Sequence, residues 1–133
     1  MTSYLSNIVV DCRDAYALAT WWKQVLGYAD LPDDPNLPGD QLCAIADPER
    51  SDQELLFIEV PEDKTAKNRL HLDLRPRERS RDKEIDVVLG LGATLVADHR
   101  GIEGPGTGWV VLADPEGNEF CILRSDAEVA ARP

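Results

Sequence analysis

An internal repeat constrains the fold of this chain more than any other feature of its sequence. The tetrapeptide ADPE occurs at residues 46–49 and again at 113–116, and each copy is followed, after a short loop, by a glutamate and an apolar run. Upstream, the pair Leu-Gly at 26–27 recurs at 91–92. Three matches in the same order at nearly one spacing indicate two copies of a module of roughly 65 residues.

Each copy has the pattern strand, helix and then three strands. Asp14 is a good N-cap for the first helix, and Gly27 suits its C-terminal end. The predicted elements are strand 6–12, helix 15–26 and strands 28–31, 41–46 and 54–60, then strand 69–75, helix 78–91 and strands 93–97, 108–113 and 119–124. We therefore expect one α+β domain, 1–125, with modules at about 1–63 and 64–125 and a flexible tail at 126–133.

The composition excludes several classes of protein. Of 133 residues, 14 are Lys or Arg and 25 are Asp or Glu, so the net charge of −11 disfavours binding to nucleic acid or to an anionic membrane. No apolar run approaches the length of a membrane span, and the amino-terminal residues lack the pattern of a secretory signal. We therefore expect a cytoplasmic protein with three reduced cysteines, since an odd number without close pairing argues against disulfides and structural zinc.

Three segments carry a resemblance to a known family: WWKQVLGY at 21–28, KNRLHLDL at 67–74 and GTGWVVLADPEGNEFCIL at 106–123. Together with the double βαβββ order, they resemble the vicinal oxygen chelate superfamily, in its glyoxalase-like domain or glyoxalase–bleomycin resistance protein branch. The resemblance implies two modules whose mixed sheet curls into a half-open cup, with the helices outside and a small-molecule or metal site inside. It also implies a homodimer. Because this fold hosts enzymes and metal-free sequestering proteins alike, it leaves the chemistry open.

The same resemblance locates the family's four metal-ligand positions. They fall on Asn7, Leu56, His71 and Cys121, of which only His71 is the expected ligand type. We therefore predict no metal cofactor. A divalent metal is the alternative, in a site shifted to Glu54 or Glu119, which share the strand faces of Leu56 and Cys121 by parity.

Strand parity selects the candidate site. His71 and Asp73 share one face, so Asp73 could orient the imidazole of His71 for proton transfer; the alternative is an ion pair between Asp73 and Arg75, with His71 a wall residue.

Cys121 is predicted to be a small buried apolar residue rather than a nucleophile, and Trp109 either stacks on a ligand or packs under the glycine-rich loop at 101–108. That loop is expected to be a mobile lid or a structural turn. The predicted catalytic residues are His71 and Asp73, and the predicted ligand-binding residues are Asn7, Asp11, His71, Asp73, Trp109 and Cys121.

Three functions remain open from the sequence. The first is a binding protein that holds a small, partly aromatic molecule in its cup without the family metal. The second is a lyase or isomerase that uses His71 with Asp73, with or without metal assistance. The third is an interaction module with a disused cup, against which the polar set of Asn7, Asp11, His71 and Asp73 argues because burying polar groups is costly.

Overall fold

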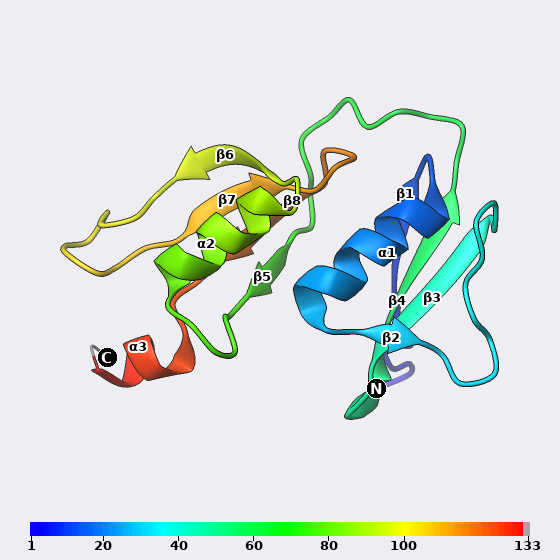
Figure 1. The fold of residues 1–133 in the computed structure, drawn as a ribbon, viewed down its shortest axis with the longest axis horizontal. Coiled ribbons are helices and arrows are strands. Elements are labelled where there is room, and N and C mark those ends of the chain that lie inside the picture. Colours follow the sequence, from blue (N-terminus) through cyan, green and yellow to red (C-terminus); the bar gives the residue numbers. More distant parts are fainter. Residues whose placement is uncertain (132–133) are drawn as a thin grey trace. The chain divides into compact units, whose positions relative to one another are not determined.

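The computed structural model describes residues 1–131 and divides the chain into two compact units, Met1–Lys64 and a second that begins at Thr65. Each unit contains one strand, one helix and three further strands in that order (Figure 1). The predicted double βαβββ pattern is therefore confirmed, and each repeat is a structural unit with its own four-stranded sheet.

The first module has a mixed sheet with strand order β1-β4-β3-β2. Its first and last strands pair in parallel, and the other neighbours pair antiparallel. The elements are β1 (Ile8–Cys12), α1 (Ala15–Leu26), β2 (Ala29–Asp30), β3 (Leu42–Asp47) and β4 (Arg50–Glu59). β4 begins four residues before the predicted start at 54, because the turn that follows the first ADP sequence is tighter than expected.

The second module repeats this topology with strand order β5-β8-β7-β6. β5 pairs with β8 in parallel, while β8 with β7 and β7 with β6 are antiparallel. The elements are β5 (Leu72–Leu74), α2 (Arg81–Gly90), β6 (Thr94–Asp98), β7 (Val110–Ala113), β8 (Glu119–Ile122) and α3 (Asp126–Ala131). β5 is much shorter than the predicted 69–75, so His71 lies immediately before the strand rather than within it.

The ends of the first helix follow from its sequence. The side chain of Asp14 accepts a hydrogen bond of 3.0 Å from the backbone N–H of Ala17, and Gly27 adopts the left-handed conformation with φ 70°. Both predicted caps are confirmed. The helix buries Leu18, Trp21 and Trp22 against the sheet of its own module.

The repeated ADPE sequence makes the same turn twice. Asp47 Oδ1 accepts a hydrogen bond of 2.9 Å from the backbone N–H of Glu49, and Asp114 Oδ1 accepts one of 2.9 Å from that of Glu116. Both aspartates are buried, and Asp114 also accepts from the backbone N–H of Asn118. The DPEGN segment is thus a hairpin turn whose aspartate satisfies backbone donors, and its role is structural.

One face of each sheet forms a small core. In the second module the side chains of Val110, Leu112, Phe120 and Ile122 are fully buried, as are Ile85 and Val88 of α2. Because side chains alternate along a strand, Val111, Cys121 and Asp73 lie on the opposite face of the sheet. Because the core residues fix the orientation of the strands, they also determine that Val111, Cys121 and Asp73 lie on the opposite face of the sheet.

Residues 126–131, which we expect to be a flexible tail, form the short helix α3 instead. Ser125 and Glu128 make a capping box: Glu128 N–H donates to Ser125 Oγ, and Ser125 N–H donates to Glu128 Oε1. Glu128 Oε1 also accepts a bond of 2.7 Å from the backbone N–H of Arg81, which attaches α3 to the start of α2. Residues 132 and 133, the rest of the expected tail, lie outside the described residues.

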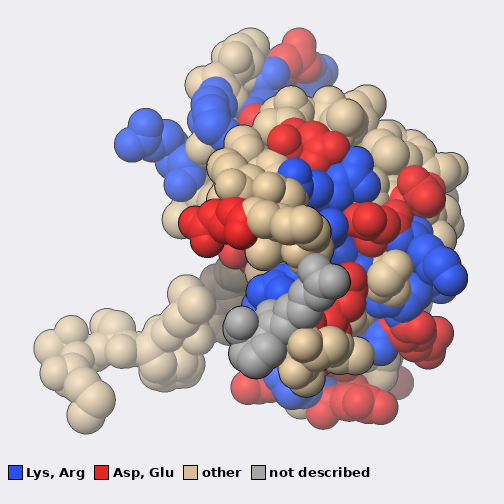
Figure 2. All heavy atoms as spheres, turned by 90° about the vertical axis from the view of Figure 1, so that its left-hand side faces the viewer, with Lys and Arg blue, Asp and Glu red and all other residues tan. Residues whose placement is uncertain are grey.

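The basic residues around α2 are balanced by acidic neighbours. Arg79 pairs with Glu84 at 2.6 Å, and Asp82 pairs with both Arg81 and Arg100. Figure 2 shows Lys and Arg interspersed with Asp and Glu on the face that it presents, rather than gathered in one basic patch.

Within residues 1–131, none of the helices has the length and the apolar composition that a membrane span requires.

The glycine-rich loop between β6 and β7 is internally hydrogen-bonded. Backbone bonds join His99 with Trp109 and Gly101 with Thr107 across the loop. The buried guanidinium of Arg81 donates to the carbonyls of Thr107 and Gly108, at 2.6 and 2.9 Å, and so ties the base of the loop to α2. These contacts are those of a structural turn, the second of our two expectations for this loop.

Gly108 is a position in this loop that admits no side chain. A Cβ placed there would lie 1.9 Å from the carbonyl oxygen of His99, and φ is +88°. We predict that Gly108→Ala lowers the free energy of unfolding by about 3 kcal/mol or more, because the steric overlap adds to the cost of the backbone conformation. Urea unfolding followed by circular dichroism measures the loss.

Gly101→Ala is the matched control. Its φ of +76° is similar, but its Cβ would meet nothing closer than 3.7 Å. This variant should lose only about 1–2 kcal/mol. Equal losses in the two variants would contradict the assigned close approach of the backbone at Gly108.

Candidate functional site

Strand pairing brings the candidate residues together on one face of the second module's sheet. Asp73 is paired with Cys121 across the parallel β5–β8 ladder, and Cys121 is paired with Val111 across the antiparallel β7–β8 ladder. Side chains two residues away share the same face, which adds His71 and Trp109. His71 and Asp73 therefore lie on the same face of the sheet, as predicted, although His71 precedes the strand.

This face bears a hollow of about 360 Å³. It is lined by Lys67, His71, Asp73, Trp109, Val111, Glu119, Cys121 and Leu123. Four of the six predicted ligand-binding residues, namely His71, Asp73, Trp109 and Cys121, thus line one hollow. Parity with Cys121 had already identified Glu119 and could also have identified Leu123, whereas no strand pattern placed Lys67 here.

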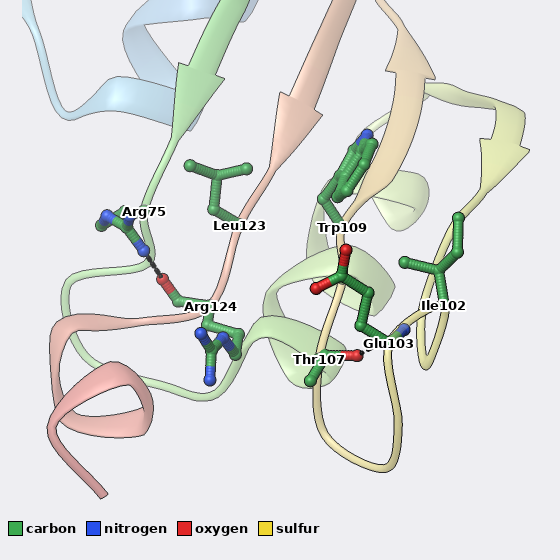
Figure 3. Close-up of a pocket in the computed structure, with 8 residues that line it drawn as sticks. Arg75, Ile102, Glu103, Thr107, Trp109, Leu123 and Arg124 are labelled. Atoms are coloured by element: carbon green, nitrogen blue, oxygen red, sulfur yellow. Dashed lines mark hydrogen bonds between the residues drawn. The ribbon is translucent and has the colours of Figure 1, made fainter. Parts of the chain in front are cut away.

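A second hollow of about 520 Å³ adjoins the first through Trp109 and Leu123, which line both. Figure 3 shows it between Arg75 on one side and Ile102 and Glu103, from the β6–β7 loop, on the other. The Arg75 guanidinium donates a bond of 2.7 Å to the backbone carbonyl of Arg124. We refer to the two adjoining hollows together as the groove, which is lined by apolar side chains and by charged side chains of both signs.

Asp73 contacts His71 and not Arg75. Nε2 of His71 lies 3.4 Å from Oδ1 of Asp73, and each side chain is 52% exposed. Arg75 approaches Asp126 at 3.9 Å instead. The geometry matches the pairing expected of an oriented imidazole, and the alternative ion pair between Asp73 and Arg75 is absent from the contacts within residues 1–131.

Cys121 is a buried, protonated thiol at neutral pH. Burial, followed by the charge of Asp73 and a hydrogen bond to it, raises the pKa of the thiol to about 11. A nucleophilic cysteine needs the opposite shift. The prediction that Cys121 is a buried residue is confirmed, and all three cysteines are free and buried.

Glu119 has a basic partner at the edge of the hollow. Lys67 forms an ion pair with Glu119 Oε1, and the Glu119 side chain is largely buried while that of Lys67 is exposed. The carboxylate proposed from parity for a shifted metal site is therefore already paired with a cation.

The remaining two predicted residues, Asn7 and Asp11, belong to the first module. Val9 pairs with Leu56, as Asp73 pairs with Cys121 in the second module, so the two parallel ladders have equivalent registers. By alternation, Asn7, Val9 and Asp11 lie on the face away from the buried Phe57. The register supports the predicted equivalence of Asn7 with His71 and of Leu56 with Cys121.

The residues at the four family positions do not fit a metal that prefers oxygen ligands. Leu56 offers no donor, Asn7 offers a neutral one, and Cys121 offers sulfur where a carboxylate is expected. Three possible ligands do meet in the second module, where donor atoms of His71, Asp73 and Cys121 lie within 4.8 Å of one another. The absence of a metal cofactor stays a prediction.

Comparison with solved structures shows the same fold. A glyoxalase/bleomycin resistance protein/dioxygenase family enzyme from Burkholderia phytofirmans PsJN is 21% identical, with 90% of this chain and 97% of that chain covered and a TM-score of 0.65. The fosfomycin resistance protein FosX from Listeria monocytogenes, as a mutant complexed with Mn(II) and 1S,2S-dihydroxypropylphosphonic acid, is 13% identical, with 99% and 98% covered and a TM-score of 0.69. A possible glyoxalase from Bacillus cereus is 11% identical, with 90% and 97% covered and a TM-score of 0.60.

These likenesses confirm the predicted fold class, α+β with tandem βαβββ modules. Among curated proteins, none matches the chain significantly. The family model for a glyoxalase-like domain matches residues 7–123, which is most of the chain. The chain therefore belongs to the glyoxalase-like domain family.

Proposed function

We propose that this glyoxalase-like domain binds a small, partly aromatic organic molecule in the groove over β5, β8 and β7, without the four-position metal site of its relatives. The observation that carries the proposal is the pair of adjoining hollows, of about 360 and 520 Å³, that share Trp109 and Leu123. Each has the volume of a typical small-molecule site, and apolar walls with a few polar groups are what such sites require.

Trp109 is the side chain best suited to hold an aromatic group. It is 37% exposed and belongs to both hollows, and its ring lies 5.0 Å from that of His99, which supports it from the side. Trp21 and Trp22 are buried in the first module. A ligand ring stacked on Trp109 would gain about 0.5–1.5 kcal/mol beyond the burial of its area.

Arg75, at the wall of the larger hollow, favours a ligand with an anionic group. Arg75 is about half exposed, and its guanidinium is held by the carbonyl of Arg124 at the wall of the larger hollow. An arginine in this position can bind a carboxylate or phosphonate with two hydrogen bonds. The small phosphonic acid bound by FosX supports this ligand class for the fold.

The test is a screen of small aromatic carboxylates and phosphonates by tryptophan fluorescence. We expect a ligand to change the emission of the wild type and of Trp21→Phe, but not that of Trp109→Phe, because only Trp109 lines the groove. Calorimetry should show that Trp109→Ala weakens binding by about 2- to 10-fold, since stacking contributes about 0.5–1.5 kcal/mol. A hit whose signal survives in Trp109→Phe and vanishes in Trp21→Phe would reject the groove.

Arg75 can be tested with the same ligand. Arg75→Gln should weaken an anionic ligand by about tenfold or more, because a charge-assisted hydrogen bond contributes about 1.5–3 kcal/mol, and should leave an uncharged analogue unaffected. Arg77→Gln removes an equal charge from an exposed loop position and is the control. Similar losses in both variants would mean that only net charge matters.

A second candidate function is a lyase or isomerase reaction with His71 as the proton-transfer group. The contact of 3.4 Å between His71 and Asp73, in the wall of the smaller hollow, supports a proton-transfer role for His71. Once a ligand is known, its conversion should be followed by NMR. We expect His71→Gln to lower kcat by about 100-fold or more, with the dissociation constant nearly unchanged.

Asp73→Asn separates orientation from proton transfer. If Asp73 positions His71, this variant should lower kcat less than His71→Gln does. A ligand that binds the wild type without any conversion would favour the binding protein. Conversion that is undiminished in His71→Gln would exclude His71 as the proton-transfer group.

A further inference from the structure

Among residues 1–131, one group of three histidine, cysteine and acidic side chains lies close enough to share a cation. It consists of His71, Asp73 and Cys121, whose donor atoms all lie within 4.8 Å of one another. The group lies within the second module, and all three of its residues line the smaller hollow. It needs no residue from the first module.

The sheet holds these side chains in place. The β5–β8 ladder sets Asp73 beside Cys121, and His71 precedes Asp73 by two residues on the same side. Two of the donors, in His71 and Asp73, are about half exposed, whereas Cys121 is buried. A cation would therefore reach the site from the open side.

We propose that His71, Asp73 and Cys121 form a three-ligand site for a thiophilic divalent cation of the zinc type, with its fourth position open to the groove. One nitrogen, one oxygen and one sulfur donor are the ligand types that zinc accepts. Two of these donors, His71 and Cys121, lie at family positions. The set differs from the family's because Asp73 is not one of those positions and because Asn7 and Leu56 take no part.

The distances suit a tetrahedral ion. Metal–ligand bonds of about 2.0–2.3 Å place tetrahedral donors about 3.5 Å apart. Nε2 of His71 and Oδ1 of Asp73 are already 3.4 Å apart, and the largest separation in the group closes with small rotations of the exposed side chains. Glu119 stays outside the set because it is paired with Lys67.

Cobalt is the probe that reports sulfur ligation directly. Protein stripped with a chelator is titrated with Co(II) alone, and the absorption spectrum is recorded. We expect one ion per chain, with a sulfur-to-cobalt charge-transfer band in the near ultraviolet and the strong visible bands of tetrahedral Co(II). One equivalent of Zn(II) should abolish both.

The variants assign the ligands. Cys121→Ser should remove the charge-transfer band, and Cys12→Ser should keep it, because Cys12 is a buried thiol in the first module. His71→Gln and Asp73→Asn change exposed side chains, so they should fold as the wild type does, and each should weaken Co(II) by more than about tenfold. Asp86→Asn, which changes an exposed aspartate of α2, should leave Co(II) binding unchanged.

Three results would overturn the site: a wild type without the charge-transfer band, a band that depends on Cys12 instead of Cys121, or an affinity that His71→Gln and Asp73→Asn leave unchanged. Circular dichroism checks that Cys121→Ser is folded, and the two exposed variants decide the question if it is not. Since the titration uses no organic ligand, its outcome is independent of the proposed binding function.

Discussion

The parallel pairing of β5 with β8 is the interaction on which the candidate site depends. Parallel neighbours cannot be joined by a short hairpin, so the connection between them contains α2, β6 and β7, and the whole second module is built into that crossover. The pairing sets Asp73 beside Cys121, with His71 on the same side. A slip of one residue would turn these side chains into the core and bring Leu72 or Leu74 to the groove.

The two modules share a backbone and differ in chemistry. The turn aspartates Asp47 and Asp114 are equivalent because both satisfy the same backbone donors. The pair Asp73 and Cys121, by contrast, corresponds to Val9 and Leu56. The repeat thus preserves the residues that the backbone turns require, while the residues on the sheet face differ. Among the described residues, only the second module brings three His, Cys or acidic side chains close enough to share a cation.

The position of Trp109 depends on contacts made elsewhere in its module. Arg81, at the start of α2, donates to the carbonyls of Thr107 and Gly108, and Gly108 fits only because it has no Cβ. The next residue is Trp109, whose ring forms the shared wall of both hollows. A buried guanidinium and a tight backbone contact therefore position the proposed stacking surface.

The sequence alone determined the repeat, the element order, the caps of α1 and the face shared by His71 and Asp73, because these follow from local periodicity and from short-range hydrogen bonds. It did not reveal that α3 would form, since Glu128 bonds to the backbone of Arg81, far away in the sequence. Nor did it reveal that Lys67 would pair with Glu119, or that Cys121 would complete a cluster with His71 and Asp73. Only the tertiary structure decided these features, because each requires that two distant segments meet, and the register of the β5–β8 ladder sets the distance between their side chains.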